Sequence, residues 1–225
     1  MNGRLRVLLV GRGRMGQLVE SLAPEHDVEV VGAITTSNAQ DVRAWPAADV
    51  AIDFSAADAV ASNARALASR GLSLVIGTTG WQQHAAALRT DLERTGVGVI
   101  AAPNFAIGVN VLLAIAERSA ALLAQHGFDA WIHEAHHAAK KDAPSGTALA
   151  LRHAAEASGL AVDISSTRAG HIPGTHTLGF DSPAETITLT HTARDRTAFA
   201  RGALEAAKWV HGRTGWFTMA EMLGL

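Results

Sequence analysis

Short apolar runs alternate with amphipathic segments over the first hundred residues of the chain. Five of these runs have the length and aliphatic character of buried strands; they lie at residues 6–10, 28–34, 50–54, 72–76 and 97–101. Ala- and Leu-rich segments of helical length separate several of them, most clearly at 56–70 and 82–94. Strands that alternate with helices predict a parallel sheet with helices on both faces. We therefore expect an α/β fold here.

The pattern changes after Pro103. An Ala- and Leu-rich segment at 109–124 predicts one long helix, and a second helix is expected at 147–158. Residues 130–134 form a candidate strand. From 165 to 192 apolar and polar positions alternate as in strands, with glycines and prolines between them. Strands without intervening helices favour an open, mixed or mostly antiparallel sheet.

Two further helical patterns, at 197–211 and 219–223, end the chain. We expect them to pack back on the first domain, which would then comprise residues 1–106 and 197–225. Residues 107–196 would form a second, smaller α+β domain.

The composition excludes several classes of protein. Of the 225 residues, 48% are hydrophobic and 18% are charged, which suffices for a sizeable core. The net charge of −2 gives no overall bias toward nucleic acid or anionic membranes, and the absence of cysteine excludes disulfides and thiolate sites. The apolar run at 7–10 is too short for a signal peptide or a membrane span, so we expect a cytoplasmic protein.

A glycine-rich turn directly follows the first predicted strand and opens a helix. It has the spacing GxGxxG and consists of Gly11, Arg12, Gly13, Arg14, Met15 and Gly16. In this position the glycines permit a tight turn, approach of a pyrophosphate to the backbone, and close packing of helix on strand. We therefore expect the first domain to bind a dinucleotide through these six residues.

The end of the second strand indicates which dinucleotide is bound. An acidic residue there would bond the ribose diol of NAD, but this chain has Thr35 and Thr36 followed by Ser37 and Asn38. Hydroxyl and amide groups, with Arg12 or Arg14, suit a 2′-phosphate. We expect NADPH as cofactor, with NADH as the alternative.

Two more polar segments follow predicted strands, where ligands of open α/β sheets bind. The first comprises Gly77, Thr78 and Thr79, and the second comprises Ala102, Pro103, Asn104 and Phe105. We expect both to frame the nicotinamide end of the cofactor.

The segment 134–148 carries most of the groups that move protons. It contains His136, His137, Lys140 and Lys141, and a helix follows at once. At the start of that helix, Ser145, Gly146 and Thr147 offer hydroxyl and N–H groups suited to a carboxylate. Since consecutive lysines seldom both point inward, we expect only one of the two to matter.

We expect no metal at this segment. His133, His136 and His137 have partly suitable spacing, but zinc needs three or four ligands, and no third ligand lies at suitable spacing nearby. His171 and His176, in a turn-rich region, are expected to be structural or surface groups.

Several motifs together resemble one enzyme family. In chain order they are GRGRMG, IDFS, GTTG, APNFAIGVN, EAHHAAKKDAPSGTA and RAGHIPGTHT. The chain is thereby identified as a member of the 4-hydroxy-tetrahydrodipicolinate reductase (dihydrodipicolinate reductase) family, enzymes of bacterial lysine and diaminopimelate biosynthesis. The resemblance covers nearly the whole chain. It implies a Rossmann-type nucleotide domain, a domain for substrate binding and oligomerisation, a dicarboxylate substrate and a homotetramer built through the second sheet.

The resemblance also implies roles for single residues. His136 matches the family's proton donor and acceptor, and Lys140 matches its catalytic lysine. Substrate-binding positions fall on His137, Gly146 and Thr147, with Ser145 beside them, while Thr35 and Thr36 fall where the adenosine ribose is contacted. For Arg196 we weigh a contribution to the positive potential around the substrate against a plain surface position.

Two alternatives stay open at this point. One is a reductase of the same fold that acts on another amino or imino acid. The other is a catalytically silent nucleotide-sensing protein, which the presence of both His136 and Lys140 disfavours. The chain also departs from the family pattern, since its glycine turn is one residue shorter than usual.

Overall fold

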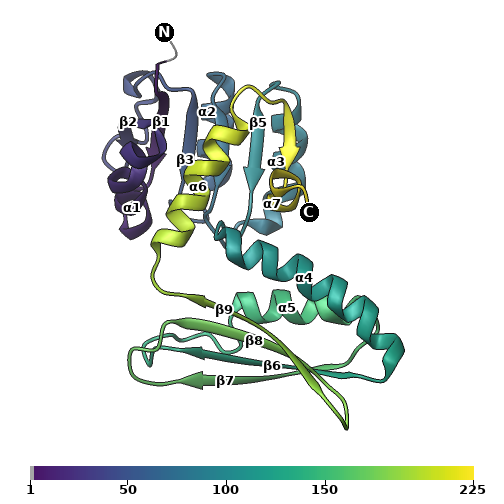
Figure 1. The fold of residues 1–225 in the computed structure, drawn as a ribbon. Coiled ribbons are helices and arrows are strands. Elements are labelled where there is room, and N and C mark those ends of the chain that lie inside the picture. The colour runs from purple at the N-terminus through teal and green to yellow at the C-terminus, as the bar shows by residue number, and fades with distance from the viewer. Residues whose placement is uncertain (1–2) are drawn as a thin grey trace. The chain divides into compact units, whose positions relative to one another are not determined.

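The computed structural model describes residues 3–225, which form two compact units (Figure 1). Unit 1 contains the chain up to Ala106 together with Arg196–Leu225, and unit 2 contains Ile107–Asp195. The final segment thus returns to the first unit.

Unit 1 is built on a six-stranded sheet in which every paired strand is parallel. Its order is β10-β5-β4-β3-β1-β2. The strands are β1 (Leu5–Val10), β2 (Val28–Ile34), β3 (Val50–Asp53), β4 (Ser73–Ile76), β5 (Gly98–Ala101) and β10 (Gly215–Phe217). The predicted parallel α/β sheet is confirmed. Strand β10 was not predicted, because three residues are too few to show a period.

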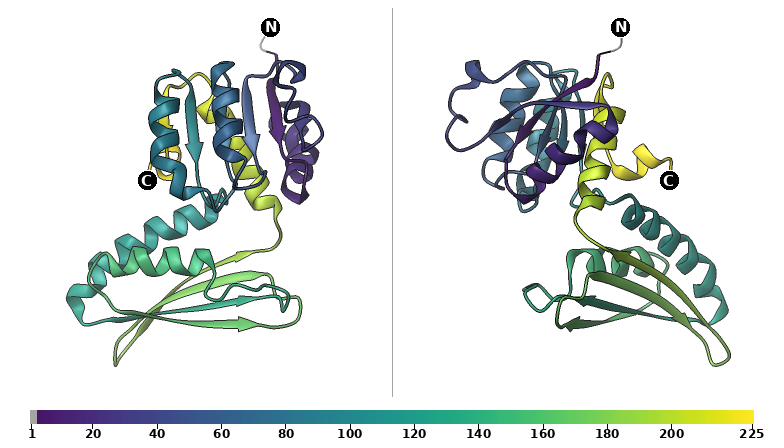
Figure 2. Two further views of the ribbon diagram at one scale, coloured as in Figure 1. Left: turned by 180° about the vertical axis from the view of Figure 1, so that it is seen from behind. Right: turned by 60° about the vertical axis from the view of Figure 1, so that its left-hand side comes forward.

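Helices cover both faces of this sheet, as the views in Figure 2 show. The helices are α1 (Arg14–Leu22), α2 (Val60–Ser69), α3 (Ala85–Glu93), α6 (Thr197–Val210) and α7 (Met219–Leu223); short 3-10 turns are η1 (Ala23–His26), η2 (Val42–Ala44) and η3 (Gln82–His84). Alternate residues of each strand enter two separate cores. Val7 and Leu9 pack with α1, α6 and α7, whereas Leu8 and Val10 pack with α2 and α3. Helix α6, from the end of the chain, therefore packs with α1 and α7 on one face of the six-stranded sheet.

Unit 2 places two helices on one face of a four-stranded sheet of order β7-β6-β8-β9. Its elements are α4 (Ile107–Leu123), η4 (Ala124–His126), β6 (Asp129–His136), α5 (Gly146–Glu156), β7 (Val162–Arg168), β8 (Gly174–Asp181) and β9 (Thr186–Ala193). Strands β6 and β7 are parallel because α5 connects them, while β6–β8 and β8–β9 are antiparallel. The sheet is therefore mixed, as the fold class allowed.

The long helix α4 is strongly apolar. The stretch Ile107–His126 is long and apolar enough to cross a membrane, with a mean hydropathy of 1.6. A core helix meets the same criterion, and Leu112, Ala116 and Ala120 of α4 do lie in the core of unit 2. The hydropathy of α4 is accordingly weak evidence for a membrane span.

Candidate active site

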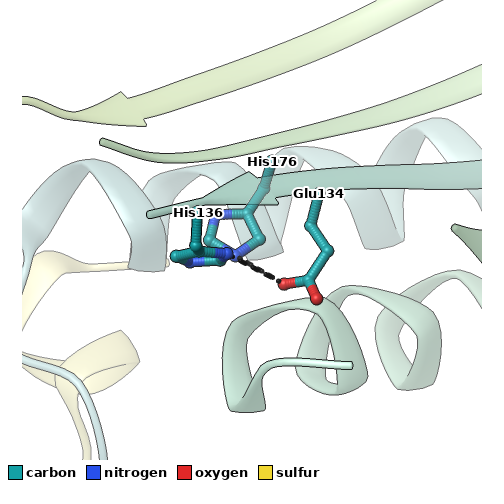
Figure 3. Close-up of side chains that lie close together, drawn as sticks. All are labelled: Glu134, His136 and His176. Atoms are coloured by element: carbon teal, nitrogen blue, oxygen red, sulfur yellow. Dashed lines mark ion pairs between the residues drawn. The ribbon is translucent and has the colours of Figure 1, made fainter. Parts of the chain in front are cut away.

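Three buried polar side chains meet on the helix-facing side of the unit 2 sheet. They are Glu134 and His136 of β6 and His176 of β8 (Figure 3). Residues 130, 132, 134 and 136 are the buried positions of β6, so the alternation of the strand carries Glu134 and His136 inward beside Ile132. In the antiparallel register Glu134 lies directly opposite His176. The cluster thus follows from strand pairing.

The Glu134 side chain is fully buried and its two oxygens differ. Oε1 accepts hydrogen bonds from Arg168 Nη2 (2.6 Å), Ser166 Oγ (2.7 Å) and the Ser145 amide (3.1 Å). Burial alone would raise the pKa of Glu134, but the hydrogen bonds from Ser145, Arg168 and Ser166 lower that pKa to about 2. Glu134 is therefore a carboxylate at neutral pH.

The other oxygen of Glu134 faces two imidazoles. Oε2 lies 3.4 Å from His136 Nδ1 and 3.6 Å from His176 Nε2. Within residues 3–225 neither Oε2 nor His136 Nδ1 has a hydrogen-bond partner. A donor and an acceptor, both buried, thus lie just beyond hydrogen-bonding distance of each other.

His136 ends β6 and is 8% exposed. Its Nε2 lies beside Gly174, where a Cβ atom would come within 3.1 Å of that nitrogen. Burial lowers the pKa of His136, Glu134 raises it, and Lys140 and Arg168 lower it further. The balance favours a neutral imidazole whose protonation responds to these neighbours.

His176 lies deeper and binds the start of helix α5. Its Nε2 is 2.9 Å from Ser145 Oγ, which also caps the helix by accepting from the Ala148 amide (3.2 Å). Burial lowers the pKa of His176 to about 4, and the neighbouring His136 adds to this effect. Of the two positions expected for His176, structural or surface, the burial of the side chain excludes the surface one, and its inward position follows from the pairing of β8 with β6.

The loop after β6 holds Lys140 near this cluster through its partners. Lys140 Nζ donates to both oxygens of Asp142 (2.8 and 3.0 Å), and Arg168 Nη2, which binds Glu134, also donates to the Asp142 carbonyl oxygen (2.6 Å). Lys140 is half-buried, whereas Lys141 is exposed. The two lysines thus differ in burial, as expected if only one of them matters. The catalytic role of Lys140 stays a prediction.

The predicted substrate residues fall into two groups. Ser145, Gly146 and Thr147 begin α5 next to the cluster, and His137 directly follows β6. The Ser145 hydroxyl already binds the Ala148 amide and His176. Substrate binding here would therefore have to use the backbone N–H groups of the neighbouring residues. Arg196 belongs to unit 1, where it is exposed and precedes α6. These binding roles stay predictions.

The expected absence of a metal also stays a prediction. Glu134, His136 and His176 each offer one ligand atom, and these atoms lie within 4.8 Å of one another. Sequence spacing did not reveal this set because His176 comes from another strand.

The glycine turn in unit 1 fits a pyrophosphate. Gly11 has a φ of +88°, and a Cβ there would collide with the Phe54 carbonyl, while a Cβ on Gly16 would collide with the Gly11 carbonyl. Gly13 precedes α1, and a Cβ on it would meet nothing within 4 Å. The first turn of α1 contains no acidic side chain. The backbone is therefore open to an anion at the carboxyl end of β1, the strand between β2 and β3 at which the strand order reverses.

A buried carboxylate fixes the neighbouring strand ends. Asp53 Oδ1 accepts from the Ser55 amide (2.8 Å), Ser55 Oγ (2.7 Å) and Thr78 Oγ1 (2.8 Å). Burial raises the pKa of Asp53 against the effect of these hydrogen bonds. Because the Thr78 hydroxyl donates to Asp53, only the backbone of Thr78 remains for a cofactor. Thr79 is exposed. A Cβ on Gly77 would collide with the Phe54 ring.

The other predicted cofactor residues also have distinct surroundings. The Phe105 side chain is buried and packs edge-to-face with Phe54 at 6.5 Å, and Asn104 Oδ1 accepts from the Ala106 amide (2.9 Å). Ala102 is half-buried and Pro103 is exposed. Phe105 is thus a core residue that supports this strand end.

Several polar groups of the segment after β2 form hydrogen bonds with one another. Thr35 Oγ1 lies 2.8 Å from Ser37 Oγ, and the Thr35 amide donates to Asn38 Oδ1 (2.7 Å). Thr36 is exposed. Arg12 forms an ion pair with Glu20 (2.9 Å), whereas in residues 3–225 no ion pair engages the exposed Arg14. Arg14 is therefore the arginine of the turn that is available for a phosphate.

Comparison with known proteins agrees with this arrangement. Sequence models of dihydrodipicolinate reductase match both parts of the chain, the N-terminus at residues 5–105 and the C-terminus at 108–223. The chain is 41% identical over 251 residues to 4-hydroxy-tetrahydrodipicolinate reductase of Acidiphilium cryptum (strain JF-5), with all of both chains covered. It is 42% identical over 225 residues to the enzyme of the same name from Xanthomonas euvesicatoria pv. vesicatoria (strain 85-10), with 93% of each covered.

Solved structures show the same fold. A dipicolinate-bound dihydrodipicolinate reductase from Paenisporosarcina sp. TG-14 superimposes with a TM-score of 0.80 at 23% identity, covering 96% of this chain and 98% of the other. A diaminopimelate dehydrogenase of C. glutamicum gives a TM-score of 0.57 at 14% identity, with 96% and 93% covered. The predicted resemblance is thereby confirmed, and the chain belongs to the dihydrodipicolinate reductase family of NAD(P)H-dependent oxidoreductases.

Proposed function

We propose that this chain reduces 4-hydroxy-tetrahydrodipicolinate to tetrahydrodipicolinate with NADPH, a step of lysine and diaminopimelate biosynthesis, with NADH as the alternative cofactor. The relatives that cover the whole chain carry the name of this reductase. The observation that carries the proposal is the buried His136, which lies within the electrostatic influence of Lys140 and beside Glu134, the carboxylate bound to the Ser145 amide at the start of α5. The cytoplasm is the location that accords with such a biosynthetic enzyme.

The substrate's carboxylates need cations and N–H groups. The first turn of α5 presents backbone N–H groups, as any helix N-terminus does, and Gly146 leaves this turn open because a Cβ there would meet nothing within 4 Å. His137 and Lys140 flank the same turn in sequence. We assign the binding of one substrate carboxylate to Gly146 and Thr147. Lys140 supplies the positive charge that faces the substrate ring.

Loss of the C4 hydroxyl and a C5 proton as water leaves a C4–C5 double bond conjugated with the C=N bond of the ring. NADPH, when bound, would supply the hydride that adds to C4. The electron pair of the C4–C5 double bond then moves toward the ring nitrogen as an enamine, so C5 requires a proton. His136, once it has taken up a proton from solvent, is suited to deliver this proton, and Lys140 stabilises the negative charge. A general acid placed in this way contributes roughly 10²- to 10⁴-fold to the rate.

The catalytic assignment predicts the result of three substitutions. His136→Gln and Lys140→Ala should each lower kcat roughly 10²- to 10⁴-fold while NADPH still binds. Lys141→Ala is the matched control and should turn over normally, since Lys141 is exposed. Steady-state oxidation of NADPH with freshly generated substrate measures all three. Normal turnover in both test variants would contradict the assignment, and a wild-type protein that binds NADPH but does not reduce this substrate would point to another imino acid.

The choice of cofactor should depend on Arg14. An arginine–phosphate hydrogen bond is worth about 1.5–3 kcal/mol, so Arg14→Ala should weaken NADPH binding roughly ten- to hundredfold. NADH lacks the 2′-phosphate, and its affinity should hardly change. Fluorescence titration with both nucleotides tests this, with Arg12→Ala as the comparison. An equal loss for NADPH and NADH would contradict a 2′-phosphate contact.

We also propose a homotetramer formed through the second sheet. The helices of unit 2 cover one face, and the other carries exposed threonines of β9 hydrogen-bonded to β8 through the pairs Thr177–Thr190 (3.0 Å) and Thr175–Thr192 (3.1 Å). The same face carries Asp129, Asp163 and Asp181 toward one end of the strands, so the part of it that suits contact with a second copy is the part with these threonines.

A charge placed on that face should break the assembly. Thr190→Lys is expected to convert a four-chain species to smaller ones in sedimentation velocity experiments. Thr90→Lys, at an exposed position of α3 in unit 1, is the matched control and should leave the assembly intact. An unchanged oligomer in Thr190→Lys would contradict the proposed interface.

A further inference from the structure

One oxygen of the Glu134 carboxylate is satisfied and the other is not. Oε1 accepts three hydrogen bonds, from Arg168, Ser166 and Ser145. Among residues 3–225 Oε2 has no donor, although it is fully buried. A buried acceptor without a donor is unfavourable, so the structure favours whatever group can donate to Oε2.

The nearest candidate donor is His136 Nδ1, 3.4 Å from Oε2 (Figure 3). This nitrogen is itself buried without a partner. A hydrogen bond from Nδ1 to Oε2 would satisfy both atoms and leave Nε2 as the nitrogen that exchanges protons. Nε2 lies on the side of Gly174, where the lack of a side chain keeps the imidazole edge clear.

We infer that Glu134 is a positioning residue, which keeps one proton of His136 on Nδ1, so that Nε2 is the nitrogen that takes up a second proton from solvent and delivers it to the reacting carbon. The inference rests on the proposed function for the identity of the reaction, but the pairing of Glu134 with His136 does not. It assigns a role to a side chain that need not touch the substrate.

His176 differs from His136 in ways that fit a support. It is 5% exposed, its Nε2 is already within hydrogen-bonding distance of Ser145 Oγ, and its low pKa keeps it neutral. It therefore lies between Glu134 and the first turn of α5 without adding charge.

The same three side chains also offer ligand atoms to a metal. A cation would have to share the Glu134 carboxylate with Arg168, whose Nη2 lies 2.6 Å from Oε1, and would lie near Lys140 as well. These positive charges favour a proton over a divalent cation at this carboxylate. Treatment with a chelator should therefore leave turnover unchanged, and a loss that zinc restores would overturn the inference.

The principal test is Glu134→Gln, which keeps the size of the side chain and removes its charge. We expect kcat to fall at least about tenfold with little change in the KM for the dicarboxylate, since part of the general-acid contribution is lost. Glu156→Gln, an exposed position of α5, is the matched control and should behave as wild type. Unchanged kcat in Glu134→Gln would overturn the inference.

The pH dependence distinguishes positioning from simple structural support. The groups that face His136 are Glu134, His176, Lys140, Arg168 and Asp142. Glu134 raises the pKa of His136, so removing its charge should move the His136 titration to lower pH. A pH–kcat profile and an NMR titration of the His136 ring both report this midpoint, and an unmoved midpoint would overturn the inference.

A double variant checks that Glu134 acts through His136. In a His136→Gln background, Glu134→Gln should cause no further loss of kcat, whereas a loss equal to that in wild type would overturn the inference. If Glu134→Gln does not fold, Glu134→Asp keeps the charge but retracts it, and should also lose kcat; normal kcat there would overturn the inference. If the wild type does not reduce the dicarboxylate, the proposed function fails, and the NMR titration alone still decides whether Glu134 controls His136.

Discussion

The candidate site in unit 2 depends on the hydrogen bonds to the buried carboxylate of Glu134. A fully buried charge is tolerated only when it is paired and hydrogen-bonded, and removing one partner of such a pair typically costs about 3–5 kcal/mol. Glu134 obtains its partners from β7 through Ser166 and Arg168 and from the start of α5 through Ser145. Arg168 extends the network to the loop of Lys140 by binding the Asp142 carbonyl. One carboxylate thus joins β6, β7, the start of α5 and the loop of Lys140.

Unit 1 uses a buried carboxylate in a comparable way. Asp53 ends β3 and accepts hydrogen bonds from Ser55 and from Thr78, which follows β4. The two loops are thereby fixed at the carboxyl end of the sheet, near the Gly11 turn. In both units the acid connects polar loops to the sheet, and in the parallel sheet of unit 1 these loops lie at the strand ends where ligands are expected. The difference lies in the neighbours, since Asp53 is bonded to hydroxyl and amide groups and Glu134 faces two imidazoles.

The sequence was sufficient to predict those features that depend on local pattern. Strand and helix periods predicted the parallel sheet of unit 1 and the return of α6, and the GxGxxG spacing predicted the turn at Gly11. It did not predict β10, whose three residues show no period, or the parallel pairing of β6 with β7. Features that depend on pairing between distant strands were outside its reach.

The site shows the same limit. His136, Lys140 and Ser145 are close in sequence, and their segment was found from residue type and spacing. For His176 the sequence left a structural and a surface position open, because a histidine in a turn-rich stretch gives no local sign of its partner. In the structure it alternates with Leu178 and Phe180 on the inward face. The hydroxyls of Ser145 and Thr78 looked available to ligands, yet tertiary contacts with His176 and Asp53 already engage them.

The most direct measurement is the tautomer of His136 in the folded protein at neutral pH. Nitrogen-15 NMR of protein labelled at histidine distinguishes protonated Nδ1 from protonated Nε2, and the signal of His136 is assigned by its loss in His136→Gln. If Glu134 organises the site as described, the proton lies on Nδ1, and it moves to Nε2 or is shared between the two nitrogens in Glu134→Gln. A wild-type His136 protonated on Nε2 would contradict the account.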